Sequence, residues 1–521
     1  MHRIWSVPEL LSLIFGCFDD KSDILRCALV CRAFSTEAAR LIWKKVEDFS
    51  QLLGCFPQET ILIELSGDSY EQNRTFRFLH LPHPSEWNQM RHRARMIKEL
   101  TFSEFDNYDA VLEVIQRFKI DLAFPGLISL HLYISVVKRS QTFLPLFASS
   151  RLQELEINFE GYNDRLVNTT MEMLVAQAHP LRCLDIGAKS FPQLSQHCLI
   201  QILESSSSLD FLRFDLKTEH GEGVMEAVAS LPNLRGIRVE FAGGDGERIA
   251  YSPGFPSLVS FDMWAPYTSV LAATRAITSP NIATLLVAVQ NKPIEPPTGL
   301  FQTIGTMASL NSIILRFLNS ESLRWADATP LLSLPSISRL DIWVGGLWVE
   351  LDDEAISVIS RTWPNLTSLR MSGRARLPES VTRPTLRGLA VLLAGCPILQ
   401  DLGLEIDARA AQLQAALANT PPASSKPRGN LIFDVKTSLV TPNSEAAIAD
   451  YFWTLWPGEW DISSDWIDGG WEGDTWENIR GLLQEEEGEG EEDEEEGEGE
   501  EDEEEGEGEE EGEGEEEEEG E

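Results

Sequence analysis

The chain has 521 residues, of which 43% are apolar, so it is long enough to bury a large core. Its formal net charge is −42, and residues 485–521 contain 28 acidic residues and 9 glycines, which leaves −14 for residues 1–484. An acidic body repels phosphate backbones, so no nucleic-acid partner is expected. No stretch approaches the roughly 18 consecutive apolar residues of a membrane-spanning helix, so no membrane partner is expected either.

The seven cysteines are scattered along the chain, and no two of them form a CxxC pair. This usage indicates reduced thiols, rather than a disulfide framework or a zinc site. The first residues, MHRIWSVPELLSLIF, make a poor signal peptide, because Pro8 and Glu9 fall inside its apolar region and no small-residue cleavage site follows. We therefore expect a cytoplasmic or nuclear protein with no cofactor and no metal.

Residues 1–45 predict three short helices. Pro8 and Glu9 suit a first helical turn, because proline lacks an N–H that would be unpaired there and an acid meets the helix dipole. We expect Asp23 to cap a second helix, and a third contains Ala38, Leu41, Ile42 and Trp43. Helices this short cannot bury all their apolar surface among themselves, so the excess faces another element or another protein.

Three stretches in this region resemble an F-box: VPELL at residues 7–11, LVCRAF at residues 29–34 and LIWK at residues 41–44. The family pattern is Leu-Pro-x-Glu-Leu, then Val-Cys-x-x-Trp, then Leu-Trp; Val7 and Phe34 depart from it but keep apolar bulk. The resemblance implies that the chain docks a Skp-type adaptor of a cullin ubiquitin ligase through Pro8, Leu10, Leu11, Ile14, Leu25, Val30 and Cys31. The alternative is a helical cap on the elements that follow.

Residues 46–95 are predicted to be a linker or an irregular N-terminal cap. Residues 60–65 have the composition of a strand, whereas residues 73–95 are polar and are expected to form a solvated loop. His80, His83 and His92 lie in this stretch, but their spacing matches no metal-ligand signature.

A pattern of one apolar residue, two variable residues, an apolar residue, one variable residue and a third apolar residue recurs twelve times, most clearly in LTSLRM at residues 366–371. The copies begin at intervals of 24 to 33 residues, at Ile97, Leu127, Leu152, Leu181, Leu209, Leu234, Leu258, Ile282, Leu310, Ile337, Leu366 and Leu399. This period is typical of a solenoid, and the pattern resembles leucine-rich repeats. Amphipathic helical stretches lie between most copies, so residues 96–440 predict an α/β solenoid with a parallel sheet and outer helices.

The family's turn asparagine or cysteine is absent, so we expect an irregular horseshoe with variable loops such as residues 242–247. If the repeat leucines point into the core, the residues between and after them line the concave face. The middle of that face then presents a cluster with the character of a protein-binding hot spot, formed by Trp264, Leu286, Ile314, Arg316, Trp343 and Arg370. The sequence equally allows a loop or the C-terminal segment to cover these residues.

Residues 443–456 predict a helix, and a run of tryptophans interleaved with acids follows: Trp453, Trp456, Trp460, Trp466, Trp471 and Trp476. We interpret residues 441–484 as a cap on the end of the solenoid, because terminal repeats require one. An acidic-aromatic docking peptide and a calcium loop are the alternatives, although the ligand spacing of a calcium loop is absent. Residues 485–521 have no apolar residue to bury and are predicted to be disordered.

We find no HExxH, GxSxG or GxxxxGK[ST] motif, so no enzymatic activity is expected. The chain is interpreted as an α/β protein, with an irregular leucine-rich-repeat solenoid behind an all-α F-box-like module. It would be a substrate receptor of a Skp-cullin-F-box ubiquitin ligase that binds an unknown protein. A repeat scaffold without ligase association is the alternative.

Overall fold

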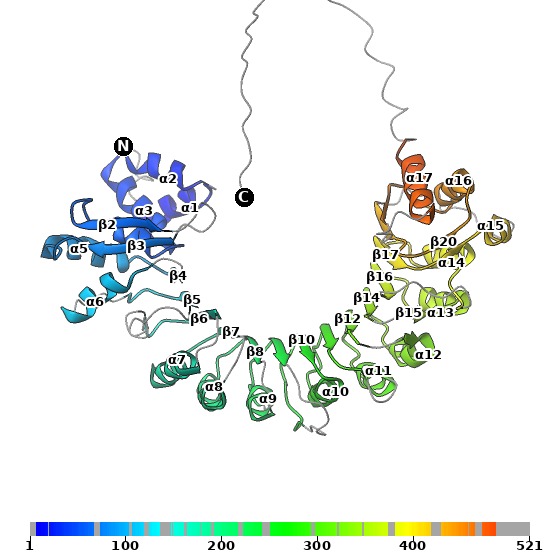
Figure 1. Cartoon of the computed structure of the whole chain (residues 1–521), viewed down its shortest axis with the longest axis horizontal. Helices are drawn as coiled ribbons and strands as arrows, with labels where there is room; N and C mark the ends of the chain where they lie inside the picture. The colour runs from blue at the N-terminus through cyan, green and yellow to red at the C-terminus, as the bar shows by residue number, and fades with distance from the viewer. Residues whose placement is uncertain are drawn as a thin grey trace, which may run out of the picture.

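The computed structural model shows a curved parallel sheet with helices along its outer side and a small helical module at its N-terminal end (Figure 1). It describes residues 7–485 except 19, 67–72, 104–106, 119–123, 136–146, 148, 161–163, 178, 189–191, 217–221, 242–250, 293–296, 320–321, 346–347, 374–380, 418–428, 457 and 464–470. The predicted loop at 242–247 and the predicted tail beyond Glu485 therefore lie outside the described residues. Among the helices described, none combines the length and apolar character needed to cross a bilayer.

The described residues form a main sheet of 15 strands, whose order in space follows their order along the chain. They are β1 (Lys45–Val46), β4 (Glu99–Ser103), β5 (Ser129–Ser135), β6 (Glu154–Glu160), β7 (Cys183–Ala188), β8 (Phe211–Leu216), β9 (Gly236–Phe241), β10 (Ser260–Ala265), β11 (Thr284–Val289), β12 (Ser312–Phe317), β14 (Arg339–Val344), β16 (Ser368–Gly373), β17 (Asp401–Leu404), β19 (Leu431–Asp434) and β21 (Trp460–Ser463). Every neighbouring pair is parallel. Each of the twelve repeat copies contains one strand, and β1, β19 and β21 lie outside those copies.

Helices cover the outer side of this sheet (Figure 1). They are α6 (Asp109–Arg117), α7 (Asp164–Gln177), α8 (Gln193–Ser205), α9 (Glu222–Ala229), α10 (Tyr267–Ala276), α11 (Thr298–Ile304), α12 (Trp325–Ala328), the 3₁₀ helix η3 (Thr329–Ser333), α13 (Asp353–Thr362), α14 (Leu386–Gly395) and α15 (Ala410–Leu417). The repeat leucines fill the layer between strands and helices, as Leu366 and Leu369 show at 0% exposure. The prediction of a parallel sheet with outer helices is confirmed.

Side chains in several of the turns that precede strands bind the preceding coil. Hydroxyl and amide groups donate to backbone carbonyls about one repeat earlier, in the pairs Ser208–Leu181, Asn233–Ser207, Ser257–Pro232, Ser309–Ile282 and Thr367–Ser338. Because buried or half-buried carbonyls need such partners, these bonds stabilise the stacking of successive coils.

Residues 73–95 do not form the solvated loop that their polar composition predicts. Strand β3 (Asn73–Phe78) pairs antiparallel with β2 (Ile61–Ser66), and helix α5 (Pro84–Ala94) follows. His83 caps α5, because its Nδ1 accepts from the N–H of Ser85 and its own N–H donates to the Glu86 carboxylate. Trp87 and Met90 are 5% and 0% exposed in the main core, so this segment, with α4 (Ser50–Leu53), continues the core at the N-terminal end.

The C-terminal segment closes the other end of the solenoid. Helix α16 (Glu445–Leu455), strand β21 and helix α17 (Trp471–Glu485) pack there, and Trp456, Trp460 and Trp476 are 1%, 4% and 1% exposed. Their indole N–H groups donate to backbone carbonyls of Gly429, Trp456 and Ser438. These three tryptophans are therefore buried at the end of the solenoid and are not available as an exposed docking peptide. Trp466 and the side chain of Trp471 lie outside the described residues.

Candidate partner-binding surfaces

Three helices form the N-terminal module: α1 (Pro8–Phe15), α2 (Lys21–Ala28) and α3 (Arg32–Ile42). Pro8 stands in the first turn of α1, as expected. The cap of α2 is Asp20 rather than Asp23, because the carboxylate of Asp20 accepts from the N–H of Ser22 at 2.8 Å. Asp23 instead lies inside the helix and pairs with Arg26 at 3.0 Å.

The module has a small core of its own, separate from the core of the solenoid. Leu11, Phe15, Ile24 and Ala38 are between 0% and 9% exposed and form that core. Phe34, which stands where the F-box pattern has tryptophan, packs edge-on against Phe15 with 5.3 Å between ring centroids. The smaller ring therefore still fills the interior of the module.

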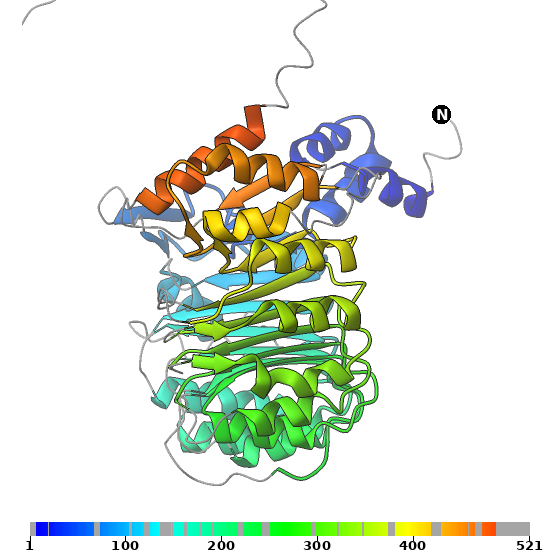
Figure 2. The same cartoon turned by 90° about the vertical axis from the view of Figure 1, so that its right-hand side faces the viewer.

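The module also exposes apolar side chains to solvent. Eight large apolar residues between positions 7 and 30 are exposed: Val7, Leu10, Leu13, Ile14, Phe18, Leu25, Leu29 and Val30. Leu29 and Val30 are 87% and 68% exposed in the turn between α2 and α3. This many exposed apolar side chains on a small domain are typical of an interaction site. Figures 1 and 2 show the module at the N-terminal tip of the curved sheet.

The structure places most of the predicted adaptor-binding residues on this surface. Pro8, Leu10, Ile14, Leu25 and Val30 are exposed, and Cys31 is half-buried. Leu11 is 2% exposed, so it belongs to the core of the module and does not face a partner. The prediction from sequence did not include the exposed residues Val7, Leu13, Phe18 and Leu29. Leu13 was detectable, since it lies three residues after Leu10 on the helix face that also holds Ile14.

Comparison with known families agrees with this geometry. A family model described as F-box-like matches residues 8–47. Residues 8–47 form an F-box-like domain. This domain spans the three helices of the module and the short strand β1, and it supports the expectation of an F-box protein. No curated protein matches the sequence. The leucine-rich-repeat assignment of the solenoid stays a prediction.

A second candidate surface is the concave face of the sheet. Strand residues that alternate with the buried leucines face this side, and the parallel register aligns them in rows. One row runs through Asp262, Leu286, Ile314, Asp341 and Arg370, and the next through Trp264, Ala288, Arg316, Trp343 and Ser372. Neighbouring strands lie about 4.8 Å apart, so the predicted hot-spot residues are brought together on β10, β11, β12, β14 and β16.

The central part of this face combines apolar and cationic groups. Trp264, Leu286, Ile314 and Trp343 are half-buried, and Arg316 is exposed between them. In Figure 1 the capping helices α16 and α17 lie at the C-terminal tip and not over these central strands. The arrangement therefore leaves Arg316 and its apolar neighbours facing the hollow of the horseshoe.

Arg370 differs from the other predicted hot-spot residues. Its Nε lies 2.9 Å from both carboxylate oxygens of Asp401, and its Nη2 lies 2.7 Å from Oδ1. These hydrogen bonds raise the pKa of the Arg370 guanidinium. Because this bidentate pair already satisfies the side chain, we assign Arg370 to holding β16 and β17 together rather than to binding a partner.

Three polar pairs also lie on the concave face. Arg213 lies 3.5 Å from Asp185, Arg238 lies 3.4 Å from Asp262, and His131 lies 2.6 Å from Glu156. Burial is the main cause that raises the pKa of Asp185 to about 6; Arg213 opposes this shift, and Glu156 and Asp215 contribute to it. Burial also raises the pKa of Asp262 and that of Asp341.

Among the described residues, no group of three or more histidines, cysteines or carboxylates is placed to hold a metal ion.

The raised pKa of Asp185 predicts a pH-dependent effect of Asp185→Asn. Between about pH 4 and pH 6 the folded protein binds the Asp185 proton more tightly than the unfolded chain does, so this group's contribution to stability is lost as pH rises. Relative to the wild type, the variant should gain about 1 kcal/mol in free energy of unfolding at pH 7.5 and almost nothing at pH 4. Urea unfolding at both pH values measures this difference.

The matched control is Asp461→Asn, which changes an exposed carboxylate on the last strand of the same sheet. It should leave the free energy of unfolding nearly equal to that of the wild type at both pH values. A loss of stability in Asp185→Asn at pH 7.5 would contradict the assignment, because it would show that the ionised carboxylate stabilises the fold.

Proposed function

We propose that this chain is the substrate-recognition subunit of a Skp-cullin-F-box ubiquitin ligase. The F-box-like domain docks a Skp-type adaptor, and the concave face of the solenoid holds a protein substrate. The observation that carries the proposal is the apolar surface of the F-box-like domain, where seven large side chains remain exposed although the domain has a filled core. Adaptor docking removes that surface from water.

The proposed receptor performs no chemistry of its own. It acts by proximity, because a substrate held on the solenoid has a high effective concentration of its lysines near the ligase. The two surfaces suit this role, since the adaptor site lies at one tip of the horseshoe and the concave face lies beside it (Figure 1). One chain then carries both the surface that docks the adaptor and the surface that holds the substrate.

Adaptor binding by the purified full chain tests the proposal. The chain and a purified Skp-type adaptor should co-elute as a complex in size-exclusion chromatography. If the two proteins elute separately at micromolar concentration, the ligase assignment fails, and the chain is then a repeat scaffold that binds partners without a ligase.

The concave hot spot makes a separate prediction about substrate capture. Arg316→Glu with Trp343→Ala should reduce recovery of at least one bound protein by about tenfold or more, because aromatic and arginine anchors supply most of the energy of an interface. Quantitative mass spectrometry after affinity purification, with the ligase inhibited, measures this loss. Thermal unfolding should change little, since Arg316 is exposed and Trp343 only half-buried.

Arg387→Glu is the control for this experiment, because Arg387 is exposed on the outer helix α14. It should recover the same proteins as the wild type. If the double variant also recovers every protein at the wild-type level, the concave site is refuted, whereas co-recovery of the adaptor still reports on the F-box-like domain alone.

A further inference from the structure

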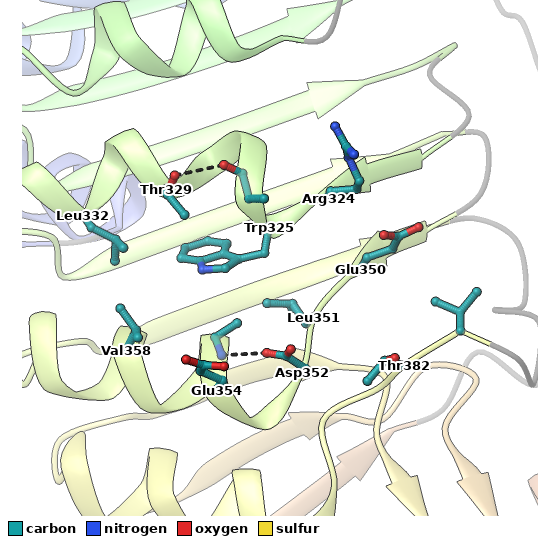
Figure 3. Close-up of a pocket in the computed structure, with 13 residues that line it drawn as sticks. Arg324, Trp325, Thr329, Leu332, Glu350, Leu351, Asp352, Glu354, Val358 and Thr382 are labelled. Carbon is teal, nitrogen blue, oxygen red and sulfur yellow. Dashed lines mark hydrogen bonds between the residues drawn. The ribbon is translucent and has the colours of Figure 1, made fainter.

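A cavity of about 500 Å³ lies on the helical side of the solenoid, away from both surfaces described above. It lies between α12 and η3 of one coil and α13 of the next (Figure 3). A small two-stranded parallel sheet, β13 (Ser322–Arg324) with β15 (Trp348–Glu350), leads into it from one side. The volume falls within the range of pockets that take a small ligand or a few residues of a peptide.

The floor of the cavity is apolar and firmly held. The indole of Trp325 lies at its centre, and Leu332 and Val358 face it from the two adjoining coils (Figure 3). Trp325 is 8% exposed and packs edge-on against Trp363 with 6.4 Å between ring centroids. The floor is therefore formed before any ligand binds, so binding costs little conformational entropy for ordering these side chains.

Carboxylates from one segment, residues 350–354, lie beside this floor. Glu350, Asp352 and Glu354 line the cavity, and among the described residues that line it Arg324 is the only cation. The charge of Arg324 is paired with that of Asp327, whose Oδ2 lies 3.3 Å from the Arg324 Nε. Asp352 caps α13 by accepting from the N–H of Ala355 at 2.7 Å.

Glu354 is exposed at the mouth of the cavity and has no hydrogen-bond or ion-pair partner among the residues that the structure describes. The N-terminus of α13 adds only about half a positive charge, which the carboxylates in its first turn exceed. The mouth of the cavity is therefore negative, above an aromatic and aliphatic floor. An anionic ligand would meet repulsion there.

We propose that this cavity binds a basic side chain, arginine or lysine, from a peptide segment that also carries an aliphatic residue. The methylene stem and the neighbouring aliphatic group pack on Trp325, Leu332 and Val358, as long cationic side chains do on apolar surface. The charged end lies over the indole and beside the carboxylate of Glu354. The site is independent of adaptor docking, because it uses neither the F-box-like domain nor the concave face.

A pair of blocked peptides tests the proposal with the full-length chain. Ac-Gly-Leu-Arg-Leu-Gly-NH₂ should show saturation transfer to its arginine methylene and leucine methyl protons by NMR, and its affinity should fall with added salt. The same peptide with glutamine in place of arginine should bind about fivefold more weakly or worse. Equal affinity of the two peptides, or no transfer to the arginine peptide, would refute the site.

Two variants locate the binding without disturbing the floor. Glu354→Gln should weaken binding of the arginine peptide about fivefold, and Ala326→Arg should abolish it, because the new side chain places a competing cation at the cavity. Both positions are exposed on helices that tolerate these residues. Glu226→Gln, at an exposed site on the outer helix α9, is the control and should bind like the wild type. If Glu354→Gln and Ala326→Arg also bind like the wild type, the peptide does not occupy this cavity.

Discussion

Replacing both Leu29 and Val30 by aspartate should weaken binding of a Skp-type adaptor by at least about 100-fold. These two side chains are 87% and 68% exposed, and burying each one in an interface contributes about 1.5–3 kcal/mol. Aspartate removes that contribution and places an unpaired charge against an apolar partner, which adds a desolvation cost. Isothermal titration calorimetry with purified adaptor measures the change, and every 1.4 kcal/mol lost corresponds to a factor of ten.

The stability of the F-box-like domain should survive this double substitution, because both residues lie in the turn between α2 and α3 and outside the domain core. Leu194→Asp, at a 49% exposed apolar site on α8, is the matched control and should leave adaptor affinity unchanged. Leu11→Asp is a poor test, since Leu11 is 2% exposed and its substitution would unfold the domain. Adaptor affinity within threefold of the wild type in the double variant would refute docking through this surface.

The regular part of the fold was predictable because its two periodicities are local. A leucine, two variable residues and an alternating apolar pair identify a strand that is buried on one side, and an amphipathic stretch then identifies a helix that covers it. Since each coil packs mainly on its neighbours, a repeat read in sequence is also a repeat in space. All twelve copies accordingly contain strands of one sheet.

The segment at residues 73–95 escaped prediction because its apolar residues are few and widely spaced. Phe76, Trp87 and Met90 are buried, yet arginines and histidines surround them in the sequence. Composition alone then indicates a loop, whereas three large side chains on one side are enough to fix a strand and a helix against an existing core. The capping box at His83 is a further signal, although histidine is an uncommon residue for that position.

The finer features of the binding surfaces depend on contacts between coils, which no local pattern encodes. Leu10 and Leu11 are adjacent in sequence, but the helix turns one outward and the other into the core. From its residue type and position in the repeat, Arg370 is a hot-spot candidate. The structure pairs it with Asp401, 31 residues later in the chain. The cavity around Trp325 joins residues of two coils and a third short segment, so no motif marks it.

The largest loss of stability should follow from Trp363→Ala. Trp363 is 1% exposed, its Nε1 donates to the Leu334 carbonyl at 2.7 Å, and its own carbonyl accepts from the Cys396 thiol. One residue thus joins three successive coils.

Truncation should cost about 3–5 kcal/mol of free energy of unfolding, because it opens a cavity and leaves the Leu334 carbonyl unpaired. In a solenoid the substitution weakens one interface between neighbouring coils, so urea unfolding should split into two transitions. Hydrogen exchange should then be faster in the coils from α13 onward than in the F-box-like domain. Trp363→Phe keeps an aromatic ring and should lose only part of this free energy, and Trp343→Ala, at a half-buried tryptophan, should cost far less. A loss below about 1 kcal/mol for Trp363→Ala, or a single unchanged transition, would show that the coils are not coupled through this residue.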